Sequence, residues 1–74
     1  MKLVRVEWWD AASTAEWAYK EDLLEPVDVT TVGYLARDDE AYIVICASLT
    51  DGAQLGDCIA IPKGIILKQE DVHA

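Results

Sequence analysis

The feature that most limits the fold is a series of five short apolar runs, each followed by residues typical of turns or helix caps. Runs of this length are typical of β-strands, and Gly, Pro or clustered acidic residues mark the connections. A chain of 74 residues forms one domain. We therefore expect a mostly β domain over residues 1–74, built as a small, partly open five-stranded barrel. The predicted strands are residues 2–9, 27–36, 41–49, 57–61 and 65–70.

The first run alternates between apolar and polar residues, as a half-buried strand does. Val4, Val6 and Trp8 share one face, which we expect to face the core. Trp9 has the opposite parity and is expected on the wetter side of the strand. An aromatic residue there could stack on a base or line a subunit interface, or simply make an edge contact.

A short helix is predicted between the first two strands. Residues 13–16 (STAE) fit a capping box, in which Ser13 and Glu16 cap each other's backbone amides. The helix should continue to about Leu24 and end before Pro26. Trp17 should pack inward, together with Leu24 one heptad further on. Gly33, inside the next run, predicts a bulge or a sharp bend.

The sequence offers few groups for chemistry. Cys46 and Cys58 lie in apolar runs, so two buried thiols are the favoured interpretation, and a disulfide is left open. His73 is the single histidine and lies next to the last residue. A zinc site or a Ser-His-Asp or Cys-His relay would need more ligands or a better placed histidine. We therefore expect no catalytic residues, no metal and no cofactor.

The charge balance bears on partners. The net charge is −8, from 14 acidic and 6 basic residues, which disfavours binding to a nucleic-acid backbone. No apolar run approaches the ~20 residues of a membrane-spanning helix, and the first residues lack a signal-peptide core. We therefore expect a cytoplasmic protein that acts away from membranes. The acidic residues could serve solubility alone or could form a surface that a host protein binds.

Three segments resemble the motifs of small β-barrels. Residues 32–35 (VGYL), the acidic turn with Asp38 or Asp39, and residues 43–45 (IVI) resemble the first motif of the Sm-like fold. Residues 61–66 (IPKGII) resemble the second Sm motif and also the end of an SH3 barrel, where an Ile-Pro turn precedes the last strand. The resemblance implies an SH3/Sm-like barrel. Ala41 and Tyr42 stand where Sm proteins often have a polar base-contacting residue, so RNA binding of that kind is not expected.

The whole chain is similar to a group of small uncharacterised proteins of tailed phages and prophages. The similar segments are residues 6–10 (VEWWD), 31–35 (TVGYL) and 59–64 (IAIPKG). The resemblance implies a phage origin and action in the cytoplasm of an infected bacterium. It implies no reaction.

Two hypotheses for the function follow. In the first, a homo-oligomer sequesters a small nucleotide signal made by bacterial defence systems, in sites between subunits. Trp9 and Tyr34 would stack on the base, while Lys63 and Gly64 would hold a phosphate. The simpler interpretation of Lys63 and Gly64 is a solvated turn. In the second hypothesis the chain is a protein-interaction module or inhibitor, which binds a host protein through its acidic and aromatic surface.

Overall fold

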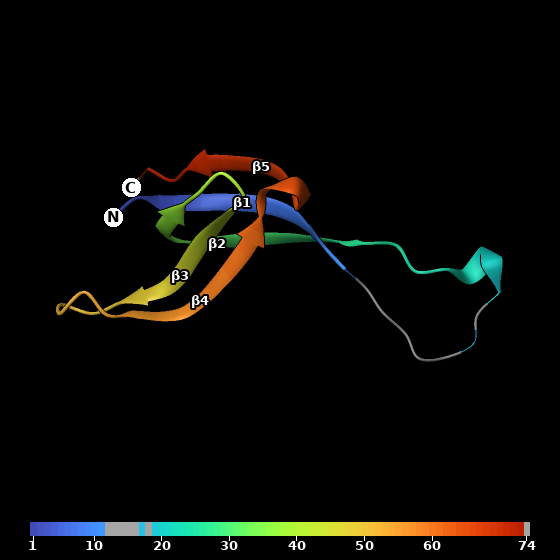
Figure 1. The fold of residues 1–74 in the computed structure, drawn as a ribbon, viewed down its shortest axis with the longest axis horizontal. Coiled ribbons are helices and arrows are strands. Elements are labelled where there is room, and N and C mark those ends of the chain that lie inside the picture. Colours follow the sequence, from blue (N-terminus) through green and yellow to red (C-terminus); the bar gives the residue numbers. More distant parts are fainter. Residues whose placement is uncertain (12–16, 18, 74) are drawn as a thin grey trace.

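A computed structural model describes residues 1–11, 17 and 19–73. Its strands form one antiparallel sheet in the order β4-β3-β2-β1-β5 (Figure 1). The sequence prediction of a mostly β chain with five strands is confirmed. The elements are β1 (Leu3–Asp10), the 3-10 turn η1 (Lys20–Asp22), β2 (Val27–Asp38), β3 (Tyr42–Leu49), β4 (Leu55–Pro62), the 3-10 turn η2 (Lys63–Ile65) and β5 (Ile66–Asp71).

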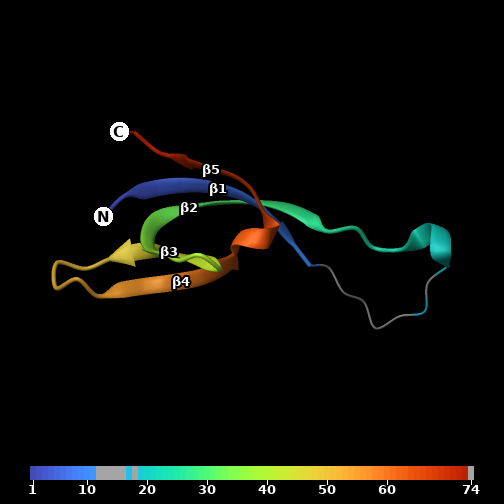
Figure 2. The same cartoon turned by 45° about the horizontal axis from the view of Figure 1, so that its top comes forward.

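The long strand β2 belongs to both halves of the sheet. It pairs with β1 from Val27 to Tyr34 and with β3 from Tyr34 to Asp38. Its register with β3 shifts between Leu35 and Arg37, and such irregularities bend a strand. The sheet therefore folds over on itself, so that β5, β1 and the middle of β2 lie over β3 and β4 (Figure 2).

The core lies between these two halves. As the alternation predicts, Val4, Val6 and Trp8 are buried, and they pack in one cluster with three isoleucines of β3 and β4. The indole Nε1 of Trp8 donates a hydrogen bond of 2.9 Å to Oγ1 of Thr31, so the one polar atom of this large side chain is satisfied. The isoleucines are Ile43, Ile45 and Ile61.

Gly33 of β2 lies in close contact with β3. A Cβ atom built on Gly33 would lie 2.5 Å from Cγ2 of Ile45 and 2.8 Å from the carbonyl oxygen of Cys46. Only glycine leaves room for this approach. The irregularity expected at Gly33 lies two residues further along β2, between Leu35 and Arg37, and Gly33 itself marks the close contact with Ile45.

The predicted helix does not extend to Leu24. Its start, including the capping box at residues 13–16, lies outside the described residues. The described remainder contains only η1, followed by extended backbone at Leu23. Trp17 is fully exposed and Leu24 is 52% exposed, so the expectation that they pack inward is wrong. Short helices are marginal in water without a surface to pack on, and this segment lies away from the core (Figure 1).

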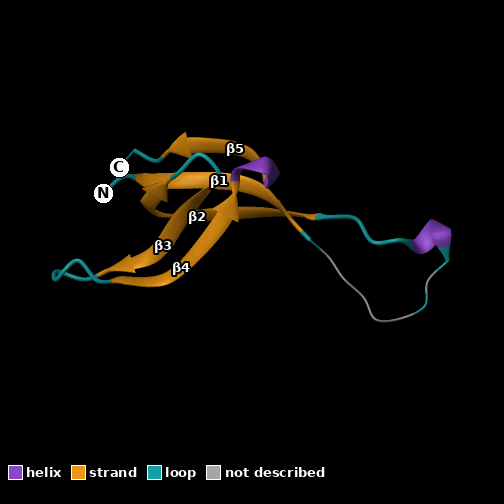
Figure 3. Ribbon diagram, in the orientation of Figure 1, coloured by secondary structure: helices purple, strands orange, loops and turns teal. Residues whose placement is uncertain are grey.

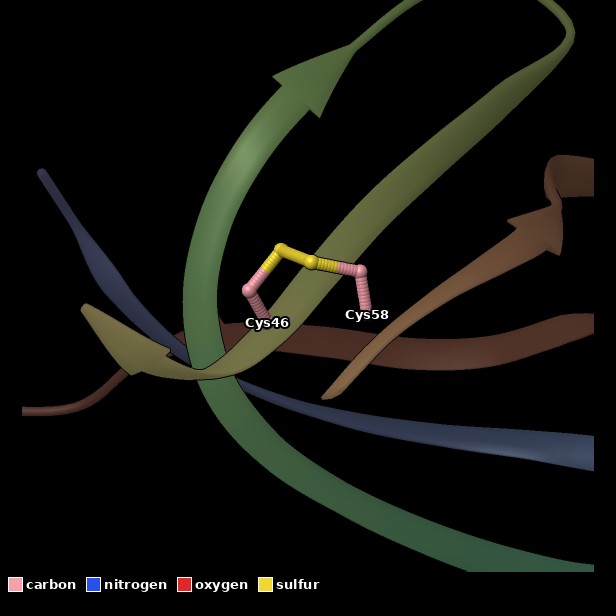
Figure 4. Close-up of a disulfide and its surroundings, with 2 residues drawn as sticks. All are labelled: Cys46 and Cys58. Carbon is pink, nitrogen blue, oxygen red and sulfur yellow. A yellow bond between two sulfur atoms is a disulfide. The ribbon is translucent and has the colours of Figure 1, made fainter. Parts of the chain in front are cut away.

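Cys46 and Cys58 form a disulfide between β3 and β4 (Figure 4). They are directly opposite each other in the strand pairing, with their Cα atoms 4.0 Å apart. Cys46 is buried and Cys58 is exposed. The favoured prediction of two buried thiols is therefore wrong, and the disulfide that the sequence left open is present. The apolar runs alone do not reveal the register that places the two residues opposite each other.

Both ends of the described chain lie at the same end of the sheet (Figure 1). The backbone amide of Val72 donates a hydrogen bond to the carbonyl oxygen of Leu3, at 2.9 Å. Nearby, Nζ of Lys2 lies 3.5 Å from Oδ2 of Asp71. The segment between β1 and β2 extends from the opposite end.

We expect Gly33→Ala to destabilise the fold by about 1–3 kcal/mol, because the added methyl group must displace Ile45 or the backbone of β3. Gly64→Ala is a matched control, since a Cβ at Gly64 has no heavy atom within 4 Å. Urea unfolding of both variants, followed by tryptophan fluorescence, measures the difference. Equal stability of the two variants would contradict a close approach at Gly33.

Reducing the disulfide should lower the stability of the otherwise unchanged chain. The two cysteines are separated by 12 residues in the sequence, and a cross-link that closes a loop of this size stabilises by roughly 3 kcal/mol. For a domain of this size the Tm should fall by about 10–20 °C. Thermal unfolding with and without a phosphine reductant measures this. The Tm of a Cys58→Ser variant should not respond to the reductant, and a wild-type Tm that also fails to respond would refute the prediction.

Candidate protein-binding surface

The structure places Trp9 and Tyr34 on the same face of the β1–β2 hairpin but at different ends of it. Trp9 pairs with Asp28, whereas Tyr34 pairs with Leu3. Asp28 and Tyr34 are six residues apart on β2, which corresponds to roughly 20 Å along a strand. The two aromatic rings therefore do not form one stacking site within a single chain.

Lys63 and Gly64 lie in η2, the turn that joins β4 to β5. The Nζ atom of Lys63 is 2.7 Å from Oδ1 of Asp38, and the Lys63 amide donates a hydrogen bond to the carbonyl oxygen of Ala41. These contacts tie η2 to the turn between β2 and β3. Within the described residues, no hydrogen bond, ion pair or strand pairing joins Trp9, Tyr34 and Lys63 to one another.

The most exposed apolar side chains lie in the segment between β1 and β2. We call Trp17 and residues 19–26 the arm. Apart from η1 the arm has no regular secondary structure, and it reaches the far end of the molecule (Figure 3). Tyr19 is 80% exposed, and Leu23 and Leu24 are each more than half exposed. Contiguous exposed apolar groups are typical of sites where another molecule binds.

The base of the arm is a two-stranded ribbon that the rest of the sheet does not cover. The pairing of β5 with β1 ends at Trp8, and the pairing of β3 with β2 begins only at Tyr34. Trp9 and Val27 lie on this ribbon and are 48% and 53% exposed. The prediction that Trp9 lies on the wetter side of its strand is confirmed. Trp9 thus adds an exposed aromatic side chain at the base of the arm.

The dimensions of the molecule agree with an arm that projects from the sheet. The molecule measures 51 × 24 × 21 Å and has a radius of gyration of 15.3 Å. A compact chain of this length has a radius of gyration of about 11 Å. The difference shows that a substantial part of the chain projects from the folded sheet.

The basic groups of the sheet are paired with carboxylates, whereas the described carboxylates of the arm have no described cation close by. Each of the five basic residues outside residues 10–28 lies within 4.0 Å of a carboxylate oxygen. At Arg5, a hydrogen bond with Glu70 and the charge of Glu7 raise the pKa of the guanidinium. By contrast, no described cation lies within 4.0 Å of the carboxylates on the arm and its base. Among the described side chains, these carboxylates are Asp10, Glu21, Glu25 and Asp28.

Residues 10–28 hold six of the acidic residues and one basic residue, a net charge of −5 out of the total of −8. The sequence analysis assigned the acidic residues to solubility or to a protein-binding surface. It did not single out Tyr19, Leu23 and Leu24, because it assigned their segment to a helix. The clustering of aromatic, leucine and acidic residues in one short segment was the signal that could have identified them.

No family model, curated protein or solved structure matches the chain. Among the described residues, no group of three or more His, Cys, Asp or Glu side chains is placed to hold a metal ion. No helix in the same part of the chain is long and apolar enough to cross a membrane.

The exposure of the arm predicts strong quenching of Trp17. Acrylamide should distinguish two classes of tryptophan in the wild-type protein, one accessible and one protected. Trp17→Phe should remove most of the accessible fluorescence, because Trp8 is buried and Trp9 is half covered. Trp9→Phe is the control and should remove a smaller share. Wild-type emission as protected as that of Trp17→Phe would show that the arm is covered in solution.

Proposed function

We propose that the chain is a non-enzymatic protein-interaction module that binds its partner through the arm. The observation that carries this proposal is the projecting segment on which Trp17, Tyr19 and Leu23 are exposed without contributing to the core. Leaving such groups in water is unfavourable, and covering them on association is the usual source of binding energy.

A nucleotide-sequestering homo-oligomer is the second candidate. Its supporting observation is Trp9, a half-exposed aromatic residue on an uncovered ribbon. Within one chain Trp9 and Tyr34 are well separated, and Lys63 is already paired with Asp38. A nucleotide site would therefore combine residues of different copies, and the phosphate would compete with Asp38 for Lys63.

We also propose that the bent sheet is a partly open SH3/Sm-like barrel. Two observations support it: the strand order β4-β3-β2-β1-β5, and the short 3-10 turn η2, which leads from one edge strand to the other. A phage origin and action in an infected bacterium rest on the resemblance of three short segments.

In a reducing cytoplasm Cys46 and Cys58 would be thiols, so the disulfide favours an oxidising compartment.

The function is tested by comparing wild type with an arm variant, Trp17→Ser/Leu23→Ser. Tagged proteins are incubated with bacterial lysate, and the retained proteins are quantified. We expect one dominant protein in near-stoichiometric amount with wild type and its loss with the arm variant. Leu67→Ser is the control, because Leu67 is also more than half exposed but lies on β5.

Native mass spectrometry with a panel of cyclic and linear nucleotides completes the test. We expect no stoichiometric gain in mass. Discrete oligomers that gain nucleotide mass, with no protein retained from the lysate, would overturn the interaction proposal and support nucleotide sequestration.

A further inference from the structure

The acidic groups on the arm define the chemistry of what it binds. We propose that the partner surface is an apolar groove rimmed by Lys and Arg side chains; this rests on the proposed function of the arm. The apolar groups of the arm need a groove that excludes water. The carboxylates beside them need positive charge.

The apolar contribution comes from side chains along the arm and its base. Trp17, Tyr19 and Leu23 are the most exposed large apolar residues of the arm, and Trp9 extends the surface onto β1. Aromatic residues of this kind supply most of the binding energy in protein interfaces when a pocket covers them. The arm is narrow and projects from the sheet, so a concave partner covers it better than a flat one (Figure 1).

The electrostatic contribution comes from carboxylates that lack a described cation within 4.0 Å. Glu21 and Glu25 lie on the arm, and Asp10 and Asp28 lie at its base. All four side chains are exposed, and such a group of acidic residues creates a field that attracts cations. The basic residues of the sheet do not neutralise them, because each pairs with a carboxylate of the sheet or of an adjacent turn.

The same charges disfavour a second copy of the chain as the occupant. Two copies packed together through residues 10–28, the arm and its base, would bring two segments of net charge −5 into contact. The sheet of a second copy has its basic residues already paired, and the chain as a whole carries −8. Like charges across an interface cost free energy and slow association. A basic partner would be attracted by the same carboxylates that would repel a second copy of the chain.

The test uses short synthetic amphipathic helical peptides as probes. Two peptides share a leucine face and carry either Lys or Gln on the polar face, and a third carries Lys with Ser in place of Leu. We expect the Leu/Lys peptide to bind the wild-type chain about tenfold more tightly than the Leu/Gln peptide, with an affinity that falls as salt is added. The Ser/Lys peptide should bind at least as weakly as Leu/Gln, because charge alone does not cover the aromatic groups.

Variants locate the binding surface. Trp17→Ser/Leu23→Ser should weaken binding of the Leu/Lys peptide about 100-fold. Glu21→Gln/Glu25→Gln should weaken it about tenfold and reduce its salt dependence. The matched control, Glu40→Gln/Asp51→Asn, removes two exposed carboxylates elsewhere and should leave the affinity almost unchanged.

Three outcomes would overturn the inference. Equal affinity for the Leu/Lys and Leu/Gln peptides would show that the partner need not be basic, while leaving arm-dependent capture from lysate intact. Equal effects of the two charge variants would show a response to total charge rather than to the arm. Dimerisation in sedimentation that the arm variant abolishes would identify a second copy as the occupant. Loss of arm-dependent capture from lysate would count against the proposed function itself.

Discussion

The close contact of β2 with β3 at Gly33 is the constraint on which the rest of the fold depends. Because Gly33 has no side chain, β2 can pass close to Ile45 and, with the register shift that follows at Leu35–Arg37, belong to both halves of the sheet. The bend brings Val4 and Val6 of β1 against Ile45 and its neighbours. A flat sheet of the same strands would leave these residues without a partner surface, and so small a chain has no second layer to cover them.

The sequence predicted the parts of the structure that depend on local pattern. Alternation assigned Val4, Val6 and Trp8 to the core, and a glycine inside an apolar run indicated the bend. The register of β3 with β4 depends on the turn between them and on packing, so the run around Cys46 did not reveal its pairing with Cys58. The predicted helix does not reach Leu24 for a related reason: apolar spacing favours a helix only where a surface exists to pack against, and the described residues of this segment are exposed.

Among the predicted site residues, Trp9 could be placed on the exposed side of its strand from the sequence alternation alone. The separation of Trp9 from Tyr34 could not be predicted, because the two residues belong to different strands and only the fold defines their register. The pairing of Lys63 with Asp38 likewise joins residues far apart in the sequence. The chain divides its side chains between two tasks. The sheet holds the core and the ion pairs, whereas the arm holds exposed apolar and acidic groups that contribute nothing to the core.

The position of the chain ends determines where another molecule can be attached without covering the arm. Leu3 and Val72 are hydrogen-bonded neighbours at one end of the sheet, and the arm extends from the other. Anything joined to either end, whether a fusion partner, a solid support or another copy in a tandem, is therefore held at the opposite pole from the arm. If several copies were attached to one scaffold through these ends, all their arms would point outward. Weak binding by single arms could then add up to strong multivalent attachment.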